Sequence, residues 1–389
     1  MQASWTTTAT HRIITLARHF SMSTTVADPT VLFTQKKNAA ILTLNRPKKL
    51  NALTLPMVHE LAHGFRQGQA NNSSVFIMDG AGGKAFCAGG DVAAVRAAGL
   101  SDDKTLTRDF FFHEYRLNKL IGDINKSIPQ VSIWDGITMG GGVGVSIHGK
   151  FRVCTEKSLF AKPETAIGLF PDVGASHFLC EMPGHTGEYI ALTGARLKAN
   201  DLMYSGLATH FIASELLPSM YDALSNVPVG PEQITLVQAV LDNYQAQSPS
   251  VDVNDGIFGR HRAEIDHMFS QASVEHILTE LEKGKESDPF AAETIASLGN
   301  MSPTSLKITL EQVRRAKGMS LGDCLKMEYR MCQTLMKNLD SDFYEGIRAV
   351  LVDKDRNPQW NPKEMTHVTA KEVERYFEQL APEEELHFE

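Results

Sequence analysis

Two acidic residues stand in a short segment whose other residues are apolar, glycine, proline or threonine. The segment reads "PETAIGLFPDVG" from residue 163 to residue 174, and its acidic residues are Glu164 and Asp172. It contains no Lys or Arg to neutralise them. A carboxylate in apolar surroundings is costly unless it is hydrogen-bonded or takes part in chemistry. The segment is therefore a candidate site for acid-base or nucleophilic catalysis. The alternative is that both carboxylates cap local turns.

Two glycine-rich segments could supply hydrogen-bond donors to the same site. They read "KAFCAGGDVAAV" at 84–95 and "GITMGGGVGVS" at 136–146. The second fits neither the GxGxxG spacing of a dinucleotide loop nor the GK[ST] of a P-loop. Glycines between a strand and a helix let the backbone approach a ligand closely and leave N–H groups unengaged at the helix start. Two such groups that converge on one point would form an oxyanion hole.

A possible zinc motif lies at 59–63, where "HELAH" matches HExxH. A catalytic zinc also needs a third protein ligand, and Arg66 stands where the longer metzincin motif has Gly. The apolar residues of this segment recur at helical spacing, at Val58, Leu61 and Phe65. His59 and His63 are then expected to be exposed beside this apolar stripe, and we expect no metal site.

The composition indicates a globular protein with a full core. The 389 residues are 42% hydrophobic and 22% charged, with a net charge of -8. This acidic balance argues against a protein that mainly coats nucleic acid. No run approaches eighteen uncharged apolar residues, so we expect no membrane span. The five cysteines form no CxxC pair, which favours reduced thiols.

The first 27 residues differ from the rest of the chain. They contain Arg12 and Arg18, no Asp or Glu, and many Ser and Thr, which is the composition of a transit peptide. The stretch "RHFSMS" resembles a mitochondrial processing site. We therefore predict a transit peptide over 1–27 and a location in the mitochondrial matrix; the alternative is a disordered tail.

Strand and helix patterns divide the rest of the chain. The runs "ILTLNR", "VFIMDG", "QVSIWDG" and "FRVCTE" predict strands, and "TLPMVHELAHGFRQGQ" predicts a helix between the first two. Strands that alternate with helices indicate an α/β fold. After about residue 225 only helical patterns remain, as in "SVEHILTELEKGK" and "LGDCLKMEYRMCQTLMKN". We predict a mixed core over 28–225 and a helical region over 226–389.

These motifs together resemble a known family. "LNRPKKLNALT", "GKAFCAGGDVAAV", "DGITMGGGVGVSIHG" and "AKPETAIGLFPDVGASHFL" occur in the order found in the crotonase (enoyl-CoA hydratase/isomerase) superfamily. "HEYRLN" and "DFYEGIRAVLVDKDRNPQW" resemble its branch that hydrolyses 3-hydroxyisobutyryl-CoA. The match runs from about residue 30 to about residue 380. It implies a core built as a spiral of ββα turns, an acyl-CoA substrate, and C-terminal helices that complete the pocket and often form a homo-oligomer interface.

The resemblance also assigns roles to residues. The two oxyanion-hole donors would be the N–H groups of Gly90 and Gly141. The segment 45–53 would meet the CoA moiety, with Lys48 or Lys49 available for its phosphates. Glu114, in "FFFHEYRLN", would lie at the substrate site; the alternative is an ordinary solvated helix residue.

One departure from the family separates its reactions. Enoyl-CoA hydratases of this superfamily carry a Glu two residues beyond the glycine triplet, where this chain has Gly144. The resemblance then implies hydrolysis of 3-hydroxyisobutyryl-CoA in valine breakdown, with Glu164 as base or nucleophile. Asp172 would accept a hydrogen bond from the substrate's β-hydroxyl, and no cofactor is expected, since CoA is part of the substrate. Two alternatives are another crotonase-type isomerase or lyase, and a structural subunit of the mitochondrial ribosome.

Overall fold

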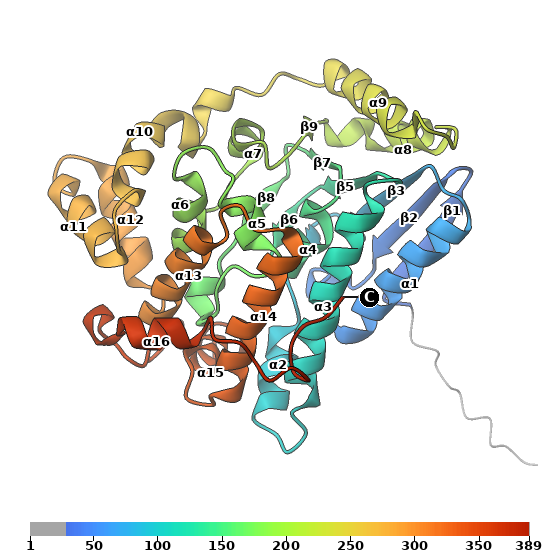
Figure 1. Cartoon of the computed structure of the whole chain (residues 1–389). Helices are drawn as coiled ribbons and strands as arrows, with labels where there is room; N and C mark the ends of the chain where they lie inside the picture. The colour runs from blue at the N-terminus through green and yellow to red at the C-terminus, as the bar shows by residue number, and fades with distance from the viewer. Residues whose placement is uncertain (1–28, 389) are drawn as a thin grey trace, which may run out of the picture.

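The computed structural model describes residues 29–388, which form two β-sheets with helices around them (Figure 1). The predicted transit peptide at 1–27 lies outside these residues. The strands are β1 Val31–Lys36, β2 Ala39–Leu44, β3 Val75–Gly80, β4 Ala85–Cys87, β5 Gln130–Trp134, β6 Ile137–Met139, β7 Phe151–Cys154, β8 Leu159–Ala161 and β9 His210–Phe211.

Helices follow most strands and fill the C-terminal part of the chain. The α-helices are α1 Leu55–Ala70, α2 Val92–Gly99, α3 Thr105–Ile124, α4 Gly141–Ile147, α5 Ala175–Leu179, α6 Thr186–Thr193, α7 Ala199–Ser205, α8 Leu217–Ser225, α9 Gln233–Gln247, α10 Ile257–Phe269, α11 Val274–Gly284, α12 Pro289–Gly299, α13 Pro303–Arg315, α14 Leu321–Lys337, α15 Asp342–Ile347 and α16 Ala370–Arg375. Short 3-10 or π turns are η1 Pro47–Lys49, η2 Glu164–Ile167, η3 Ser214–Leu216, η4 Val253–Asp255, η5 Arg348–Val352 and η6 Met365–His367.

The chain alternates between the two sheets as it advances. The larger sheet has the order β1-β2-β3-β5-β7-β9 and is parallel except for the β1–β2 pair, while β4, β6 and β8 form a smaller parallel sheet. From β3 to β8, each turn thus gives one strand to each sheet before a helix begins, whereas β1 and β2 both belong to the larger sheet. Gly136 (φ 119°) makes one of these changes of direction, and a Cβ there would lie 2.5 Å from the carbonyl O of Lys84. This confirms the predicted spiral of ββα turns.

The elements predicted from patterns are confirmed. The four predicted strands correspond to β2, β3, β5 and β7, and the predicted first helix to α1. Val58, Leu61 and Phe65 are buried on α1, as their spacing predicts. Every residue of β5 is buried, because helices cover both faces of a parallel sheet. Among residues 29–388 the last strand, β9, ends at Phe211, and the later elements are helices joined by loops.

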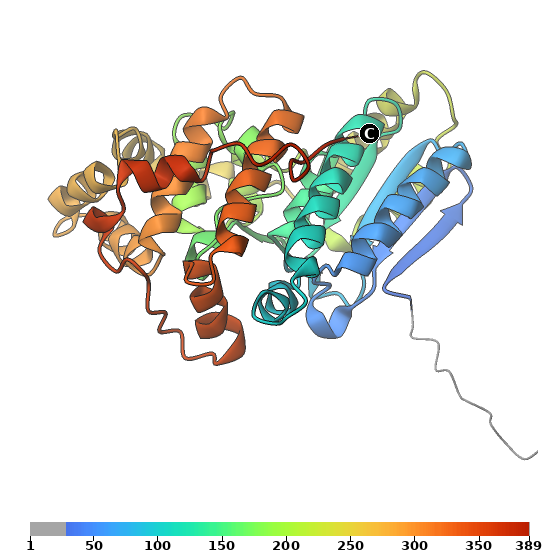
Figure 2. The same cartoon turned by 60° about the horizontal axis from the view of Figure 1, so that its bottom comes forward.

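The C-terminal helices pack directly on the spiral core. α14 lies beside α3, and the views in Figures 1 and 2 both show the two helices as neighbours. One hydrophobic cluster includes Phe110 and Tyr115 of α3, Phe170, and Leu325 of α14. The helical region therefore shares its core with the segment that contains Glu164 and Asp172. The division at residue 225 stays a prediction.

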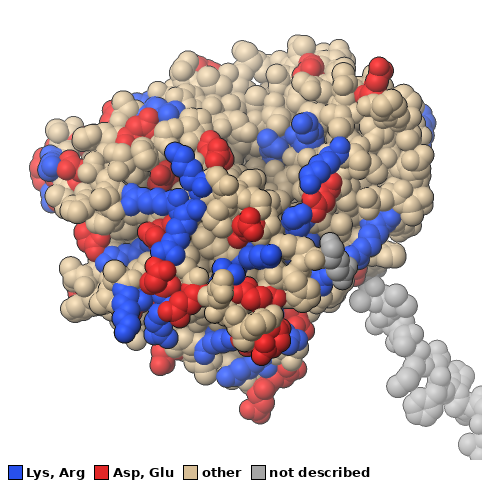
Figure 3. All heavy atoms as spheres, viewed as in Figure 1, with Lys and Arg blue, Asp and Glu red and all other residues tan. Residues whose placement is uncertain are grey.

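Charges of both signs are interspersed on the face shown in Figure 3, most densely over the C-terminal helices. No basic stretch of the kind that tracks nucleic acid covers that face. Within residues 29–388, no helix has the length and apolar character needed to cross a membrane.

We predict that Gly142→Ala destabilises the fold. A Cβ at this position of α4 would lie 2.5 Å from the carbonyl O of Cys87, so the backbone of one sheet turn would have to move. Overpacking of this kind costs about 1–3 kcal/mol, and urea denaturation would measure the loss.

Gly299→Ala is the matched control for this prediction. Gly299 ends α12, and a Cβ there would meet nothing within 4 Å. This variant should be as stable as the wild type or slightly more stable. Equal stabilities of the two variants would contradict the proposed close packing of α4.

Candidate active site

Two glycine segments face each other where β4 and β6 end. Gly89 (φ 111°) and Gly140 (φ 48°) both adopt backbone conformations that favour glycine. A Cβ placed on Gly140 would lie 3.1 Å from the Cα of Gly89, and one on Gly141 would lie 3.4 Å from the backbone N of Gly90. The segments approach this closely because neither has side chains to separate them.

The N–H groups of Gly90 and Gly141 are available to a ligand. Gly90 is held beside Leu53, since the Leu53 N–H donates to the Gly89 carbonyl (2.8 Å) and the Asp91 N–H donates to the Leu53 carbonyl (2.7 Å). Gly141 is the first residue of α4, where N–H groups have no partner within the helix. Within residues 29–388, neither N–H donates a hydrogen bond to the protein. Both N–H groups are thus unengaged at the place where the sequence predicts an oxyanion hole, and their role as its donors stays a prediction.

One face of α3 covers both glycine segments. Phe110, Glu114 and Asn118 follow each other at intervals of four residues and so lie on one side of the helix. Cβ atoms added to Gly90 and Gly141 would collide with Phe110 and Glu114, respectively. Glu114 is only 2% exposed, so it is not an ordinary solvated helix residue.

Glu164 and Asp172 lie beside the same glycines. Glu164 begins η2, directly after β8, and its Oε1 would be 3.6 Å from a Cβ on Gly140. Asp172 lies in the turn before α5 and accepts a hydrogen bond from the Tyr115 hydroxyl at 2.9 Å. Both carboxylates are 4% exposed. Asp172 thus has a partner on α3. The structure brings together all five predicted site residues, which are Gly90, Glu114, Gly141, Glu164 and Asp172.

Lys162 is the residue that the sequence reasoning missed. Its Nζ lies 2.7 Å from Oε1 of Glu164 and 3.6 Å from Oδ1 of Asp172, and its side chain is completely buried. It stands immediately before the segment 163–174, so the lack of Lys or Arg inside that segment did not mean that the carboxylates lack a cation. The signal was available one residue upstream.

Burial shifts the titration of all three carboxyls. Burial raises the pKa of Glu164 to about 7; Lys162 opposes the rise and Asp172 adds to it. Burial also raises the pKa of Asp172, against the lowering effects of Lys162 and Tyr115. The pKa of Glu114 lies well above its ordinary value, because burial and then the Asp172 charge raise it. A pKa near 7 suits Glu164 to take up a proton at neutral pH.

A further buried carboxylate, that of Glu328, holds the turn that contains Asp172. Glu328, on α14, accepts hydrogen bonds from the N–H groups of Gly174 (2.6 Å) and Ser176 (3.0 Å) and from the Ser176 hydroxyl (2.5 Å). Within the same turn, Val173 has a φ of 61°, which is rare for a β-branched residue. The bonds to Glu328 stabilise this strained conformation.

Val173 fills the space next to Gly144. A Cβ on Gly144 would lie 2.5 Å from the Cβ of Val173 and 3.0 Å from Nδ2 of Asn118. A glutamate at position 144 would therefore require the Asp172 turn to move. The site has neither the second catalytic Glu of the hydratase pattern nor room for it.

The segment 45–53 adjoins the Gly90 turn. Arg46 forms an ion pair with Asp91 at 3.2 Å, and the Asn51 side-chain amide donates to the carbonyls of Ala81 and Ala85. Lys48 and Lys49 are exposed on η1. Two exposed cations thus lie in the segment that adjoins the Gly90 turn, and their contact with CoA stays a prediction.

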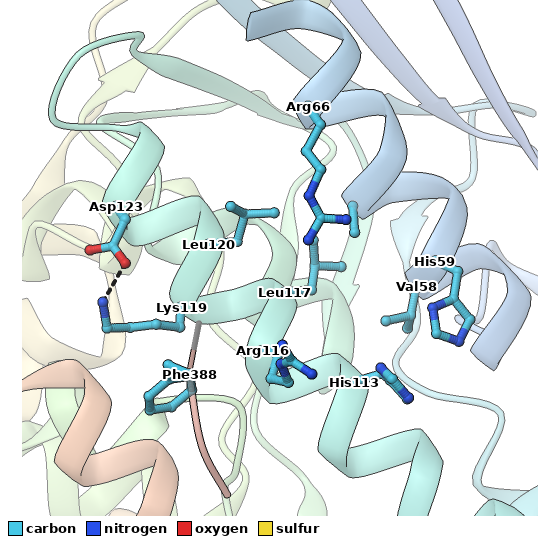
Figure 4. A pocket seen from close by; sticks show the side chains of 11 residues that line it. Val58, His59, Arg66, His113, Arg116, Leu117, Lys119, Leu120, Asp123 and Phe388 are labelled. Carbon is cyan, nitrogen blue, oxygen red and sulfur yellow. Dashed lines mark hydrogen bonds and ion pairs between the residues drawn. The ribbon is translucent and has the colours of Figure 1, made fainter.

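Of the two "HELAH" histidines, His59 lines a different hollow and His63 does not. A groove of about 310 Å³ between α1 and α3 is lined by residues that include His59, Arg66 and His113 (Figure 4). The rings of His59 and His113 meet edge-on, with centroids 4.5 Å apart, and His63 is exposed. No group of three or more His, Cys, Asp or Glu in residues 29–388 is arranged to hold a metal ion.

A ββα spiral with two unengaged glycine N–H groups facing buried carboxylates defines a crotonase-type protein. The family model described as enoyl-CoA hydratase/isomerase matches residues 39–377. The chain belongs to this family.

Curated relatives cover nearly the whole chain. The 3-hydroxyisobutyryl-CoA hydrolase, mitochondrial, of Xenopus tropicalis is 45% identical over 371 residues, which are 95% of this chain and 94% of the relative. The human protein of the same name is 43% identical, with the same coverage of both chains. A probable 3-hydroxyisobutyryl-CoA hydrolase 3 of Arabidopsis thaliana is 43% identical over 91% of this chain and 93% of its own.

Two solved structures are also similar. A carnitinyl-CoA dehydratase from Mycobacterium thermoresistibile has a TM-score of 0.81 and 37% identity, covering 92% of this chain and 99% of that one. An enoyl-CoA hydratase from Rhodobacter sphaeroides has a TM-score of 0.80 and 33% identity, covering 92% of this chain and all of that one. The whole length of the fold is therefore shared with both.

We predict that Glu328→Gln loosens the turn that contains Asp172. The substitution keeps the side-chain shape, but an amide cannot accept from all three donors and places its own N–H groups against theirs. Burial raises the pKa of Glu328 to about 7, so ionisation of Glu328 above that pH itself costs stability and would mask the loss of its bonds. A hydrogen bond contributes about 0.5–1.5 kcal/mol, so at pH 6 the free energy of unfolding should fall by about 2 kcal/mol.

Glu311→Gln is the control for this change. Glu311 is a partly exposed residue of α13 that pairs with Arg315, and such pairs contribute about 0.5 kcal/mol or less. If Glu328→Gln is no more damaging than Glu311→Gln, Glu328 does not hold the turn.

Proposed function

We propose that this protein hydrolyses the thioester of 3-hydroxyisobutyryl-CoA to the free acid and CoA. The observation that carries the proposal is the set of buried carboxylates, Glu114, Glu164 and Asp172, beside two glycine N–H groups that have no other acceptor. Donors in this position stabilise negative charge on a thioester oxygen. A carboxylate with a pKa near 7 then acts on the carbonyl carbon or on water.

The proposed reaction begins with the thioester oxygen between the Gly90 and Gly141 N–H groups. With Glu164 as base, its carboxylate takes a proton from water while the water oxygen attacks the carbonyl carbon. The tetrahedral intermediate collapses, the C–S bond breaks, and the CoA thiolate leaves with the proton from Glu164. With Glu164 as nucleophile, its oxygen attacks the carbonyl carbon instead, the C–S bond breaks, and the CoA thiolate leaves and takes a proton from solvent. Water then hydrolyses the mixed anhydride to the free acid and restores the Glu164 carboxylate.

The remaining carboxylates are proposed to read the acyl group. Asp172 has its Oδ2 engaged by Tyr115, which leaves Oδ1 for a β-hydroxyl of the substrate. Oε1 of Glu114 has no hydrogen-bond partner in the described chain, and it lies against Gly141. Glu114 is therefore placed to contact the substrate beside the oxyanion hole.

The geometry at Gly144 favours hydrolysis over hydration. The two similar solved structures are named as a dehydratase and a hydratase, whereas the curated relatives are named as hydrolases. Addition of water to a double bond needs an acid and a base on the reacting carbons. With Val173 against Gly144, one of that pair is missing, while thioester hydrolysis needs only one carboxylate near the carbonyl carbon.

Other parts of the proposal concern cofactors, location and assembly. Water and the chain's own carboxylates complete the proposed reaction, so we propose no separate cofactor. The names of the animal relatives and the composition of residues 1–27 support mitochondria, and we propose the matrix. Self-association through the C-terminal helices is a further proposal. The enzyme names of the relatives give no support to a role as a ribosomal subunit.

We predict that the purified protein releases thiol from 3-hydroxyisobutyryl-CoA and that Glu164→Gln removes most of this activity. A neutral amide can neither accept the proton nor attack, and such steps contribute about a hundredfold to ten-thousandfold in rate. Thiol release with a coloured disulfide reagent would measure the turnover number.

The exposed Glu60, on α1, provides the control variant Glu60→Gln, which should retain wild-type activity. Binding of the CoA ester should survive in Glu164→Gln. A Glu164→Gln enzyme with more than half of the wild-type rate would exclude Glu164 from the chemistry.

We also predict that Asp172→Ala reduces the preference for a hydroxylated substrate. A hydrogen bond to a charged group contributes about 1.5–3 kcal/mol. The kcat/KM ratio of 3-hydroxyisobutyryl-CoA to isobutyryl-CoA should therefore fall about ten- to a hundredfold. Both substrates will lose some activity, because Tyr115 and Lys162 also lose their partner, so the ratio is the informative quantity.

Tyr115→Phe is the matched control, since it removes the other partner of Asp172 but keeps the carboxylate. It should retain the preference for the hydroxylated substrate. Equal losses for both substrates in Asp172→Ala would mean that Asp172 only positions its neighbours.

A further inference from the structure

Lys162 is a buried cation among the carboxylates to which catalysis is assigned. We propose that Lys162 is a positioning residue of this site, whose ammonium keeps Glu164 ionised and oriented and so sets the pH range in which the enzyme works. This inference rests on the proposed function. No part of the mechanism above uses the Lys162 charge directly, so its role is separate from the roles of Glu164 and Asp172.

The contacts of the ammonium point to a role through the carboxylates. Nζ lies 2.7 Å from Oε1 of Glu164 and 3.6 Å from Oδ1 of Asp172, and it donates to the Asp172 carbonyl at 3.1 Å. The carbonyl contact is a hydrogen bond, and the two carboxylate contacts are ion pairs. The ammonium thus connects η2 with the turn before α5.

The backbone around Lys162 leaves the side chain little freedom to withdraw. Phe160 and Leu197 exchange backbone hydrogen bonds of 2.9 and 2.8 Å, which fixes the end of β8. Pro163 follows Lys162 directly, and a Cβ on Gly194 would lie 3.0 Å from the Cα of Pro163. The side chain has no exposed surface, so solvent offers no alternative position for the charge.

The charged and titratable groups around Lys162 are mostly acidic. Burial alone would lower the pKa of Lys162, but Glu164 and Asp172 raise it above its ordinary value, so the amine stays protonated. Its charge in turn opposes the burial that raises the pKa values of Glu164, Asp172 and Glu114. The groups that interact electrostatically with it are Glu164, Asp172, Glu114, Glu328 and His148. The Tyr115 hydroxyl donates to Asp172 beside it.

Removal of this charge should make Glu164 a weaker acid. An opposite charge within about 4–6 Å changes the pKa of a carboxyl by about one to three units. Since the pKa of Glu164 in the wild type is about 7, the fraction of ionised Glu164 at pH 7 would then fall about fivefold or more. Since ionised Glu164 is the reactive form, activity should be lost at neutral pH and recovered at higher pH.

The test is the pH dependence of kcat/KM for Lys162→Met, which keeps the length of the side chain without its charge. In the wild type, activity should rise with pH through about 7. In Lys162→Met this rise should move at least one pH unit to the alkaline side. The control is Lys157→Met, because Lys157 is half-exposed and pairs with Asp135 at 3.4 Å; its profile should match the wild type.

A melting experiment provides a readout that does not need activity. Glu164 has a higher pKa in the folded than in the unfolded protein, so its ionisation costs stability as pH rises between the two values. Without the Lys162 charge the pKa of Glu164 in the folded protein is higher still, so the pH range over which ionisation of Glu164 costs stability extends to higher pH. The difference in melting temperature between wild type and Lys162→Met should therefore be larger at pH 8 than at pH 5.

The outcomes separate this inference from the proposed function. Absence of thiol release by the wild type would overturn the function, while the pH-dependent melting difference would still support the charge effect. Normal hydrolysis with an unshifted pH profile in Lys162→Met would overturn the role of Lys162. If that variant does not fold at pH 8, Lys162→Gln takes its place; a loss of stability in Lys162→Gln that is equal at pH 5 and pH 8 would also overturn it.

Discussion

The site contains more negative charge than one ammonium can balance. Glu114, Glu164 and Asp172 are buried around Lys162, and Glu328 lies behind the Asp172 turn. Ionised carboxylates in such surroundings persist only with donors close by, and otherwise hold their protons. Burial is the main cause of the raised pKa values of these groups, and the Lys162 charge offsets only part of it for Glu114, Glu164 and Asp172. The burial that raises the pKa of Glu164 to about 7 is therefore also what makes its ionised form costly.

This constraint explains why neutral donors surround the carboxylates. The Tyr115 hydroxyl supports Asp172, and the N–H groups of Gly174 and Ser176 support Glu328. The Tyr115 hydroxyl comes from α3 and acts on Asp172. The two N–H groups come from the start of α5 and act on Glu328 in α14. The C-terminal helices therefore do more than cover the spiral: they exclude water from the site and supply part of its hydrogen bonding. Without them the carboxylates would be solvated and their pKa values would return toward ordinary values.

Local patterns were sufficient to predict the strands, the first helix and the C-terminal helices, because periodicity reports burial within each element. The glycines and acidic residues of the site were also recognised, since the resemblance matched them in order. Lys162 was missed because the segment was read from Pro163. Tyr115 and Glu328 were missed for a different reason: the contact between Glu328 and Gly174 joins residues far apart in the chain, and no spacing rule connects them.

The strained turn at Val173 contacts Glu328, Gly144 and the residues around Asp172. Glu328 fixes the Gly174 and Ser176 N–H groups, and this holds Val173 at a positive φ with its side chain against Gly144. The same turn presents Asp172 to Tyr115 and Lys162. A carboxylate at position 144 would displace Val173 and with it Asp172. A side chain at position 144 and the observed Asp172 turn are therefore sterically exclusive, and the absence of a side chain at Gly144 is what permits this turn on a fold shared with hydratases.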